Sequence, residues 1–391
     1  MSALHKQSQK PHFSQSTREM GHPRVGVVLR AEMNWRLARS VGATLVGLAL
    51  PGLVTAAPAP LEIRVVVVTT FEVGSDTGDE PGEFQNWVEH YPLNDILPFP
   101  QGYRSLRYNA KDHVLGIVTG AGKASAAASI MALGLDPRFD LTKAYWILAG
   151  IAGINPNRAS VGSAVWASHI VDGDLAYEID GREIPADWVT GIVAYDRAKP
   201  FEQPAPPIVS DNGTQAYDLS GELAAWAFEL TRNLNLPDDD KLKAARAGYP
   251  DLPNAQRPPF VLKGDTLTAD RFWIGVRMTD WAEKWVPYWT KGEGRFTTSA
   301  EEDSAYLQAL TFLAHAGRVD LARVLDLRSG SDYCLPPKGT SAADFLKSEA
   351  TGNYAAYAEA IENAYRVGSP VVRELARHWP LYRQTVPAAK P

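Results

Sequence analysis

The feature that most constrains the fold is a run of β-branched residues, LEIRVVVVTTF, at residues 61–71. Its four consecutive valines leave no polar face, and a strand without a polar face must be covered on both sides. Two further segments, residues 113–122 and 143–153, repeat the pattern of an apolar strand that runs into glycines. Helical patterns separate these strands. The sequence therefore predicts an α/β domain built around a largely parallel sheet.

The distribution of charge indicates which partners to expect. The whole chain has 391 residues and a net charge of −6, but beyond residue 57 there are 32 Lys/Arg against 43 Asp/Glu, a net charge of −11. An acidic body without a basic stripe is a poor binder of nucleic acids and of anionic membranes. A small molecule is the expected partner.

The first 57 residues carry a targeting pattern. From Met33 the chain shows Arg36 and Arg39, an apolar run over residues 41–54, and then small residues up to Ala57. A basic start, a short apolar run and small residues predict a cleaved secretory signal peptide at about 33–57, with Met33 as the true start. A membrane anchor is the alternative, but the run is shorter than the roughly 20 residues that cross a bilayer. We therefore expect a periplasmic or secreted protein.

The mature part, residues 58–391, is expected to form a single domain with residues 180–260 as an elaboration. No stretch in it approaches transmembrane length, so no membrane insertion of the mature chain is expected. Cys334 is the only cysteine, and the five histidines beyond residue 57 show no metal-ligand spacing. The sequence predicts neither a metal site nor a cofactor.

Two glycine-rich segments invite a phosphate-binding interpretation that the residues do not support. In VTGAGKA, Ile117 stands where a P-loop needs glycine, and Ala124 stands where it needs Ser or Thr. The dinucleotide fingerprint fails at Ser125, where its third glycine is missing. Two interpretations stay open for this turn and for AGIAG at 149–153. The glycines either bring the backbone close to a ligand or only make tight turns.

The segment RVLDLRSGSDY predicts a short buried strand at 324–327 followed by a Ser-Gly-Ser-Asp turn that carries Asp332. Together with the two glycine segments, it places three unusual features at the carboxyl ends of strands, where open α/β sheets bind ligands. The aspartate has alternative roles as the first residue of an Asx-turn or as a helix N-cap.

Taken in order, several motifs resemble those of a known family: VTTFE, GEFQNW, TGAGKASAAAS, GIAGINPNRASVGSAVW, KGDTLTADRFWIG, TTSAEEDSA and LRSGSDY. The family is the purine nucleoside permeases. More distantly, the chain resembles the nucleoside phosphorylase superfamily, especially the methylthioadenosine/S-adenosylhomocysteine nucleosidases. The likeness covers most of residues 61–345. It implies a nucleoside-phosphorylase-like three-layer sandwich around a mixed, largely parallel central sheet, with purine nucleosides as ligands.

The resemblance also implies roles for acidic residues of this chain. Asp332, preceded by Ser331, matches the aspartate that protonates N7 of the leaving purine. Glu302 matches the glutamate that binds the ribose hydroxyls, although Glu301 replaces the methionine expected before it. Glu83 matches the glutamate that activates the attacking water, and Glu72 is the alternative for that role.

The remaining implied contacts come from three of the motifs. Thr119 and Gly120 match the turn that holds the nucleophile, and Gly150 and Gly153 lie in the second glycine segment. The KGDTLTADRFW motif supplies Asp265 and, as stacking partners for the base, Phe272 or Trp273.

Two functions remain open at this stage. The first is an exported enzyme that cleaves or transfers the N-glycosidic bond of purine nucleosides, with water or phosphate as the nucleophile. The second is a non-catalytic nucleoside-binding component of uptake, which would need a membrane transporter as partner. Relatives in the superfamily often build sites across a dimer, and HIVDGDLAYEID resembles that interface. A homo-oligomer is therefore one expectation, with Asp172 or Asp174 acting on a neighbouring subunit.

Overall fold

Strand β2 (Val65–Thr69) is the valine run, and all five of its residues are buried. Val66 and Val68 pack into one hydrophobic cluster, while Val65 and Val67 pack into another on the opposite side. Because successive side chains of a strand point to opposite faces, the run has no face left for water. In this computed structural model the described residues are 59–210, 213–351 and 354–389, and they belong to one compact unit. The N-terminal extension and the expected signal peptide at 33–57 lie outside them.

Strands and helices alternate from β14 to α7, whereas β6 to β13 follow one another without a helix between them. The strands are β1 (Leu61–Glu62), β2, β3 (Asp95–Leu97), β4 (Leu106–Asn109), β5 (Val114–Val118), β6 (Phe139–Asp140), β7 (Tyr145–Ile154), β8 (Ala164–Asp172), β9 (Ala176–Glu178), β10 (Ile192–Ala194), β11 (Val209–Ser210), β12 (Gly213–Thr214), β13 (Ala216–Asp218), β14 (Val261–Thr268), β15 (Phe296–Ala300) and β16 (Val324–Tyr333). The helices are α1 (Gln85–His90), α2 (Lys123–Leu135), α3 (Gly221–Thr231), α4 (Asp240–Ala247), α5 (Val276–Trp289), α6 (Asp303–His315), α7 (Ala342–Glu349), α8 (Tyr357–Arg377) and α9 (Trp379–Tyr382), with a 3₁₀ turn η1 (Leu321–Arg323).

The central sheet is mixed and contains two parallel blocks. Strands β5, β2, β7 and β16 form one block, and β8, β14 and β15 form the other. Antiparallel pairs join the blocks twice, between β15 and β7 and between β16 and β8. The strands β8, β14, β15, β7 and β16 therefore close into a ring of neighbours. Antiparallel pairing also adds β13 beside β8, and β4 and β3 beyond β5.

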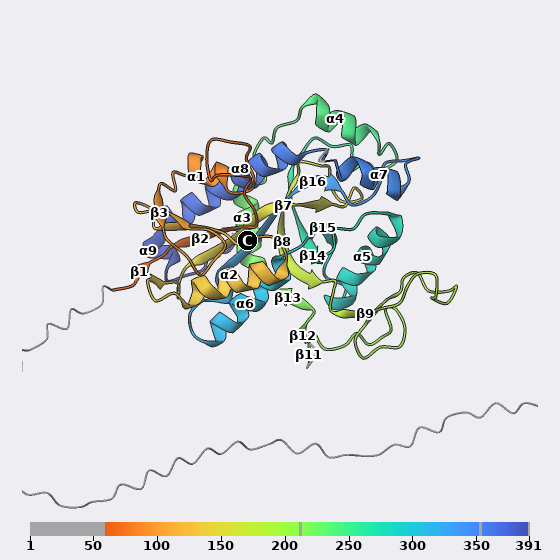
Figure 1. Cartoon of the computed structure of the whole chain (residues 1–391), viewed down its shortest axis with the longest axis horizontal. Helices are drawn as coiled ribbons and strands as arrows, with labels where there is room; N and C mark the ends of the chain where they lie inside the picture. The colour runs from red at the N-terminus through yellow and green to blue at the C-terminus, as the bar shows by residue number, and fades with distance from the viewer. Residues whose placement is uncertain (1–58, 211–212, 352–353, 390–391) are drawn as a thin grey trace, which may run out of the picture. The chain divides into compact units, whose positions relative to one another are not determined.

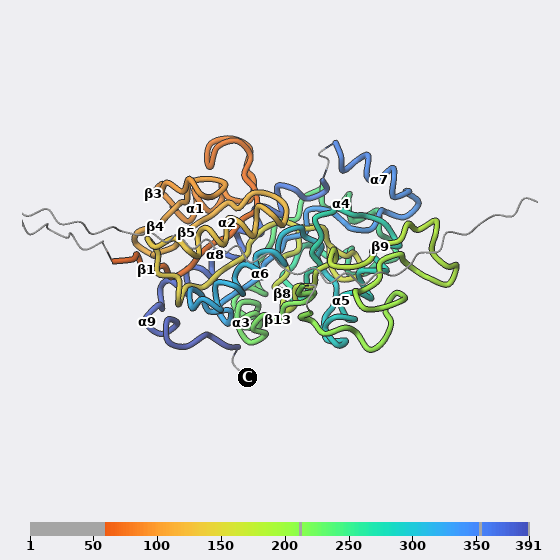
Figure 2. The backbone as a smooth tube through the Cα atoms, turned by 60° about the horizontal axis from the view of Figure 1, so that its bottom comes forward, coloured from red at the N-terminus to blue at the C-terminus, as the bar shows by residue number. Residues whose placement is uncertain are grey.

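Helices cover both faces of this sheet, which gives three layers. Figure 1 shows α1 and α8 above the sheet and α2 and α6 below it. In both Figure 1 and Figure 2, α2 and α6 lie side by side. They pack with one hydrophobic cluster, while α1, α3 and α8 pack with the other. The predicted three-layer α/β sandwich around a mixed sheet is confirmed.

Two segments expected to be turns are strand instead. AGIAG lies within β7, and the expected SGSD turn is the last part of β16, which continues to Tyr333. Pairing with β7 extends β16, and the register shifts between Gly330 and Asp332 because the bulge inserts one extra residue. Asp332 therefore sits on a buried strand opposite Gly153 rather than in a turn.

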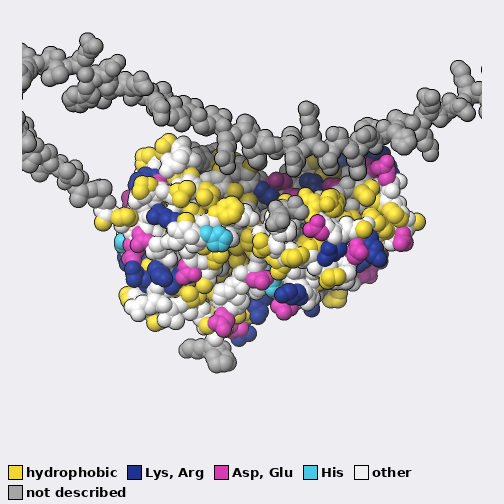
Figure 3. Space-filling view, turned by 90° about the horizontal axis from the view of Figure 1, so that it is seen from below, with side chains coloured by type: hydrophobic (Ala, Val, Ile, Leu, Met, Phe, Trp, Pro, Cys, Tyr) yellow, Lys and Arg dark blue, Asp and Glu magenta, His cyan; other side chains and the backbone are white. Residues whose placement is uncertain are grey.

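Charged side chains of both signs are interspersed on the face seen from below, with scattered hydrophobic side chains between them (Figure 3). Among the described residues, no helix is both long and apolar enough to span a bilayer.

Candidate active site

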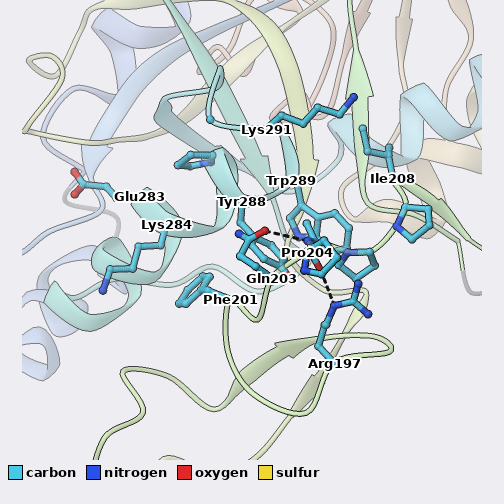
Figure 4. Close-up of a pocket in the computed structure, with 15 residues that line it drawn as sticks. Arg197, Phe201, Gln203, Pro204, Ile208, Glu283, Lys284, Tyr288, Trp289 and Lys291 are labelled. Carbon is cyan, nitrogen blue, oxygen red and sulfur yellow. Dashed lines mark hydrogen bonds between the residues drawn. The ribbon is translucent and has the colours of Figure 1, made fainter.

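Two pockets compete as the candidate site, and they differ in chemistry. The larger, of about 1210 Å³, lies between α5 and a Pro-rich loop at residues 198–208 (Figure 4). Aromatic and proline side chains such as Phe201 and Tyr288 dominate its lining. The carboxylate in the lining, Glu283, accepts hydrogen bonds from the side-chain amides of Asn155 and Asn157. Because a site is defined by convergent polar groups rather than by volume, the smaller pocket is the better candidate.

The smaller pocket, of about 320 Å³, gathers several buried carboxyl groups at the carboxyl ends of β2, β7, β15 and β16. Its lining residues are Thr70, Phe71, Glu83, Ala121, Ile151, Ala152, Gly153, Phe272, Ser299, Ala300, Glu301, Glu302, Arg328, Ser331, Asp332, Tyr354 and Tyr357.

Glu83 is held by backbone amides at the entry to α1. The amides of Thr70 and Ile151 each donate a hydrogen bond of 2.7 Å to its carboxylate. The guanidinium of Arg328 lies 3.9 Å away. Burial nevertheless dominates and raises the pKa of Glu83 to about 7. A carboxyl group with this pKa can take up a proton near neutral pH, as a general base requires.

Arg328 is a buried cation that its own carboxylates neutralise. Its Nε donates to Asp303 at 2.9 Å, its Nη2 also bonds Asp303, and Asp326 lies 3.8 Å from Nε. Asp326 accepts a hydrogen bond of 3.0 Å from Thr266. Burial and the neighbouring Asp303 raise the pKa of Asp326 well above its ordinary value. Arg328 is therefore fixed in place beside Glu83 and has little net charge to offer a ligand.

Glu302 lies where α2 and α6 begin. Its carboxylate accepts hydrogen bonds from the amide of Gly122 at 2.9 Å and from the hydroxyl of Thr70 at 3.3 Å. Burial raises its pKa, and burial together with Glu302 raises the pKa of the neighbouring Glu301 to about 7. Both glutamates line the pocket, so Glu301 adds a second carboxyl group there.

Asp332 presents one oxygen to Ser331 and leaves the other without a partner. The Ser331 hydroxyl donates to Oδ1 at 2.7 Å, and the buried Oδ2 has no hydrogen-bond partner among the described residues. Burial raises the pKa of Asp332 to about 6. A Cβ atom at Gly153 would lie 3.4 Å from this Oδ2 and 2.6 Å from Ser299 Oγ. The glycine therefore leaves room for a ligand group beside the acid.

Eleven residues are predicted from the sequence to belong to the site, and the pocket brings six of them together. These are Glu83, Gly153, Phe272, Glu302, Ser331 and Asp332.

The other five lie outside the lining. Thr119 is buried and contacts the hydroxyl of Tyr306 at 2.9 Å, while Gly120 makes a turn with φ 84°. Gly150 packs under Glu83 and Arg328. Asp265 accepts hydrogen bonds from His169 and from backbone amides, and Trp273 packs on Trp281 and Phe296.

Glu72, the alternative for the role of base, stabilises the backbone before α1. Its carboxylate accepts hydrogen bonds from the amides of Val73, Gly82, Phe84 and Gln85, which ties the chain into the start of α1. It does not line the pocket.

Sequence reasoning missed Arg328 and the aromatic lining by Phe71, Tyr354 and Tyr357. One signal was available for Arg328. Two charged residues, Asp326 and Arg328, interrupt an apolar strand at alternate positions and hence on the same face. The tyrosines gave no comparable signal. Among the described residues, no group of His, Cys, Asp and Glu is arranged to hold a metal ion.

Fold and site define an α/β protein with a carboxylate-lined small-molecule pocket where its central strands end. Within that class the chain belongs to the purine nucleoside permease family, whose sequence profile matches residues 62–387. A probable purine nucleoside permease of Schizosaccharomyces pombe is 35% identical over 283 residues, which cover 71% of this chain and 80% of that protein. The purine nucleoside permease of Candida albicans is 31% identical over 67% of this chain and 64% of its own length.

Similar solved structures include methylthioadenosine/S-adenosylhomocysteine nucleosidases. A mutant of the Helicobacter pylori nucleosidase, with 5'-methylthioadenosine in its active site, has a TM-score of 0.47 and 11% identity to this chain. The match covers 80% of this chain and 99% of that one. The Streptococcus pneumoniae nucleosidase with a transition-state inhibitor has a TM-score of 0.47 and 16% identity, again over 80% and 99%.

Proposed function

We propose that this protein binds purine nucleosides in the carboxylate-lined pocket and cleaves their N-glycosidic bond by hydrolysis. The observation that carries the proposal is the gathering of Glu83, Glu302 and Asp332, all buried, around one pocket. Membership in the purine nucleoside permease family supports the choice of ligand.

Breaking the bond between a purine and its sugar places positive charge on the sugar and negative charge on the base. Asp332, with its pKa raised to about 6 and a free Oδ2, is suited to donate a proton to the leaving base. Glu83 is suited to take a proton from water, and Glu302 to accept hydrogen bonds from sugar hydroxyls. Phe272, Tyr354 and Tyr357 offer aromatic surface for stacking.

Water is a better candidate than phosphate for the nucleophile. The first amides of α2, where an anion would bind, already donate to the carboxylates of Glu302 and Asp270. Lys123 is paired with Asp172 and Asp174 at 2.7 Å each, and Arg328 is paired with Asp303. A phosphate dianion in the pocket would therefore meet carboxylates rather than free cations.

The test is to incubate the protein with adenosine, inosine and guanosine, with and without phosphate, and to measure free base. We expect base release that does not depend on phosphate. Asp332→Asn should lower it by about 10²–10⁴-fold, because general acid catalysis is typically worth that much. The matched control Asp187→Asn changes an exposed aspartate and should leave the rate unchanged.

A second function is a binding component that hands nucleosides to a separate membrane transporter. The names of the relatives favour it, since they are described as permeases. Saturable nucleoside binding without any release of base would support this function and reject hydrolysis.

We also infer that the protein is exported, on the targeting pattern at residues 33–57. Cell fractionation followed by N-terminal sequencing tests this inference. Export predicts a mature chain that starts near residue 58, whereas an uncleaved chain in the cytoplasm would contradict it.

A further inference from the structure

A third pocket lies at the opposite end of the sheet from the candidate active site. Its volume is about 430 Å³, and its lining residues are Arg64, Lys111, Asp112, Arg373, Ala376 and Arg377. Arg64 immediately precedes β2, and Lys111 and Asp112 precede β5, so the pocket sits at the amino ends of parallel strands. The C-terminal part of α8 supplies Arg373 and Arg377.

The four cations of this pocket have no carboxylate partners among residues 59–210, 213–351 and 354–389. In the part of the chain that the structure describes, none of them lies within 4.0 Å of an acidic oxygen. Arg373 instead donates to the neutral oxygens of Ser369, His90 and Tyr365. The acid in the lining, Asp112, accepts a hydrogen bond from the hydroxyl of Tyr91 at 3.2 Å.

Arg64 is the least exposed of the four cations. Its Nη1 donates to the carbonyl of Ala376 at 3.2 Å, and its Nε is buried without a hydrogen-bond partner among the described residues. A buried N–H donor without an acceptor costs free energy, and the cost is larger when the donor belongs to a charged group. A ligand that supplies an acceptor to this N–H would therefore bind more favourably.

The carbonyl end of α8 explains part of this arrangement, because cations are favourable near a helix C-terminus. That effect accounts for Arg377, the basic residue in the last turn of α8. It does not account for Lys111, which comes from a different element, nor for the unpartnered Nε of Arg64. The excess of positive charge in a chain that is acidic beyond residue 57 indicates an anionic ligand.

We propose that this pocket binds a phosphoryl group, either as inorganic phosphate or as part of a small phosphorylated metabolite. Guanidinium groups match phosphate oxygens with paired hydrogen bonds, and three of the four cations are arginines. The site is separate from the carboxylate-lined pocket, so this inference does not depend on the proposed hydrolase activity.

The experiment is isothermal titration calorimetry at low ionic strength with two probes, inorganic phosphate and ribose 5-phosphate. Saturable binding of at least one probe is expected, and the affinities decide the source. Equal affinity for the two probes indicates that the ligand is inorganic phosphate, whereas tighter binding of ribose 5-phosphate indicates that the ligand is an organic phosphate. Added NaCl should weaken binding, because it screens exposed charges.

The combined variant Lys111→Glu with Arg377→Glu reverses two exposed charges of the pocket. It should lower the affinity for the bound probe about tenfold or more, the value of a lost charge-assisted hydrogen bond. The matched control Lys199→Glu alters an exposed lysine of the Pro-rich loop and should bind like the wild type. Absence of saturable binding to the wild type, or equal weakening in the control, would overturn the proposal. Base release by the double variant should stay unchanged, which separates this test from that of the proposed function.

Discussion

Glu83 and Asp332 are both buried carboxyl groups, yet the proposed reaction requires opposite protonation states of them. Glu83 must be ionised to take a proton from water, and its pKa is raised to about 7. Asp332 must be protonated to donate to the base, and its pKa is raised to about 6. The productive combination is then a minor one, about 6% of molecules at pH 6.5 if the two groups titrate independently.

This assignment predicts a bell-shaped dependence of kcat/KM on pH, with its maximum near pH 6.5 and limbs near pH 6 and pH 7. The acidic limb reflects protonation of Glu83, and the alkaline limb reflects ionisation of Asp332. Initial rates of base release between pH 4.5 and pH 8.5 measure the profile. A rate that does not change over this range would contradict the assignment.

Single variants should separate the two limbs. In Glu83→Gln the acidic limb should vanish, and the residual activity should fall as Asp332 ionises, near pH 6. In Asp332→Asn the alkaline limb should vanish, and the residual activity should rise as Glu83 ionises, near pH 7. Each remaining limb therefore moves toward the other by about one pH unit. Limbs that keep their wild-type positions would show that other groups titrate.

Strand β16 carries Asp326, Arg328 and Asp332, which are all buried. The same strand therefore holds the proposed acid, Asp332, and the arginine that affects the pKa of the proposed base, Glu83. Arg328 lowers the pKa of Glu83, against the larger effect of burial, and Asp303 opposes the charge of Arg328. Removing the charge of Asp303 should therefore strengthen the effect of Arg328 on Glu83.

We expect Asp303→Asn to shift the alkaline limb of the pH profile to lower pH, because the pKa of Glu83 falls and the limb near pH 7 follows the higher of the two pKa values. Asp326→Asn is the matched control at the same cluster. Burial and the neighbouring Asp303 raise the pKa of Asp326, which favours its neutral form, so its replacement by a neutral amide should move the limb less than Asp303→Asn does. A shift of the same size in both variants would show that Asp303 does not act through its charge.

The bulge in β16 depends on Gly330. A Cβ atom at this position would lie 2.9 Å from Cβ and Cγ2 of Ile154 on the neighbouring strand. Gly330→Ala should therefore lower the free energy of unfolding by about 1–3 kcal/mol, as overpacking of a core does. Urea denaturation measures the change, and Gly181→Ala is the control, since nothing lies within 4 Å of its added Cβ. Equal stability of the two variants would contradict this account of the bulge.

Local sequence patterns predicted the layers of the fold and several residues of the site. The valine run of β2, the strand before Gly120 and the acid at Asp332 are features of short segments, and each was found without tertiary information. The extension of β16 was not predicted, because pairing with β7 supplies it and the SGSD residues alone favour a turn. Tyr354 and Tyr357 reach the pocket only through the packing of α8 across the sheet, which no local pattern reports.

At the scale of the whole molecule, the buried carboxyl groups together make the stability of the fold depend on pH. Glu83, Asp332 and Glu349 are each 4% exposed or less, and burial raises their pKa values to about 7, 6 and 8. Their ordinary values are 4.5 for the glutamates and 3.8 for the aspartate, so between these limits the folded state holds more protons than the unfolded chain. Stability therefore falls as the pH rises through this window.

The remaining shifted acids and His169 do not reverse that trend. Aspartates with lowered pKa values, such as Asp136 and Asp140, lose their stabilising effect only as the pH falls below about 4. His169 gains a hydrogen bond from its pairing with Asp265, which raises its pKa, so its contribution is lost as the pH rises. Between pH 5 and pH 9 these effects act in the same direction or stay constant.

We therefore expect the free energy of unfolding, measured by urea denaturation, to be larger at pH 5 than at pH 9. Glu349 offers a test at a residue that does not line the pocket, although the charge of Asp332 adds to the rise in its pKa. It is the buried residue of α7, and its Oε2 has no hydrogen-bond partner among the described residues. Glu349→Gln removes its ionisation and should make the dependence on pH shallower, with a larger gain in stability at pH 9 than at pH 5. The exposed control Glu222→Gln should keep the wild-type slope. If Glu349→Gln also keeps that slope, Glu349 is ionised in the folded protein at neutral pH, and burial does not hold its proton.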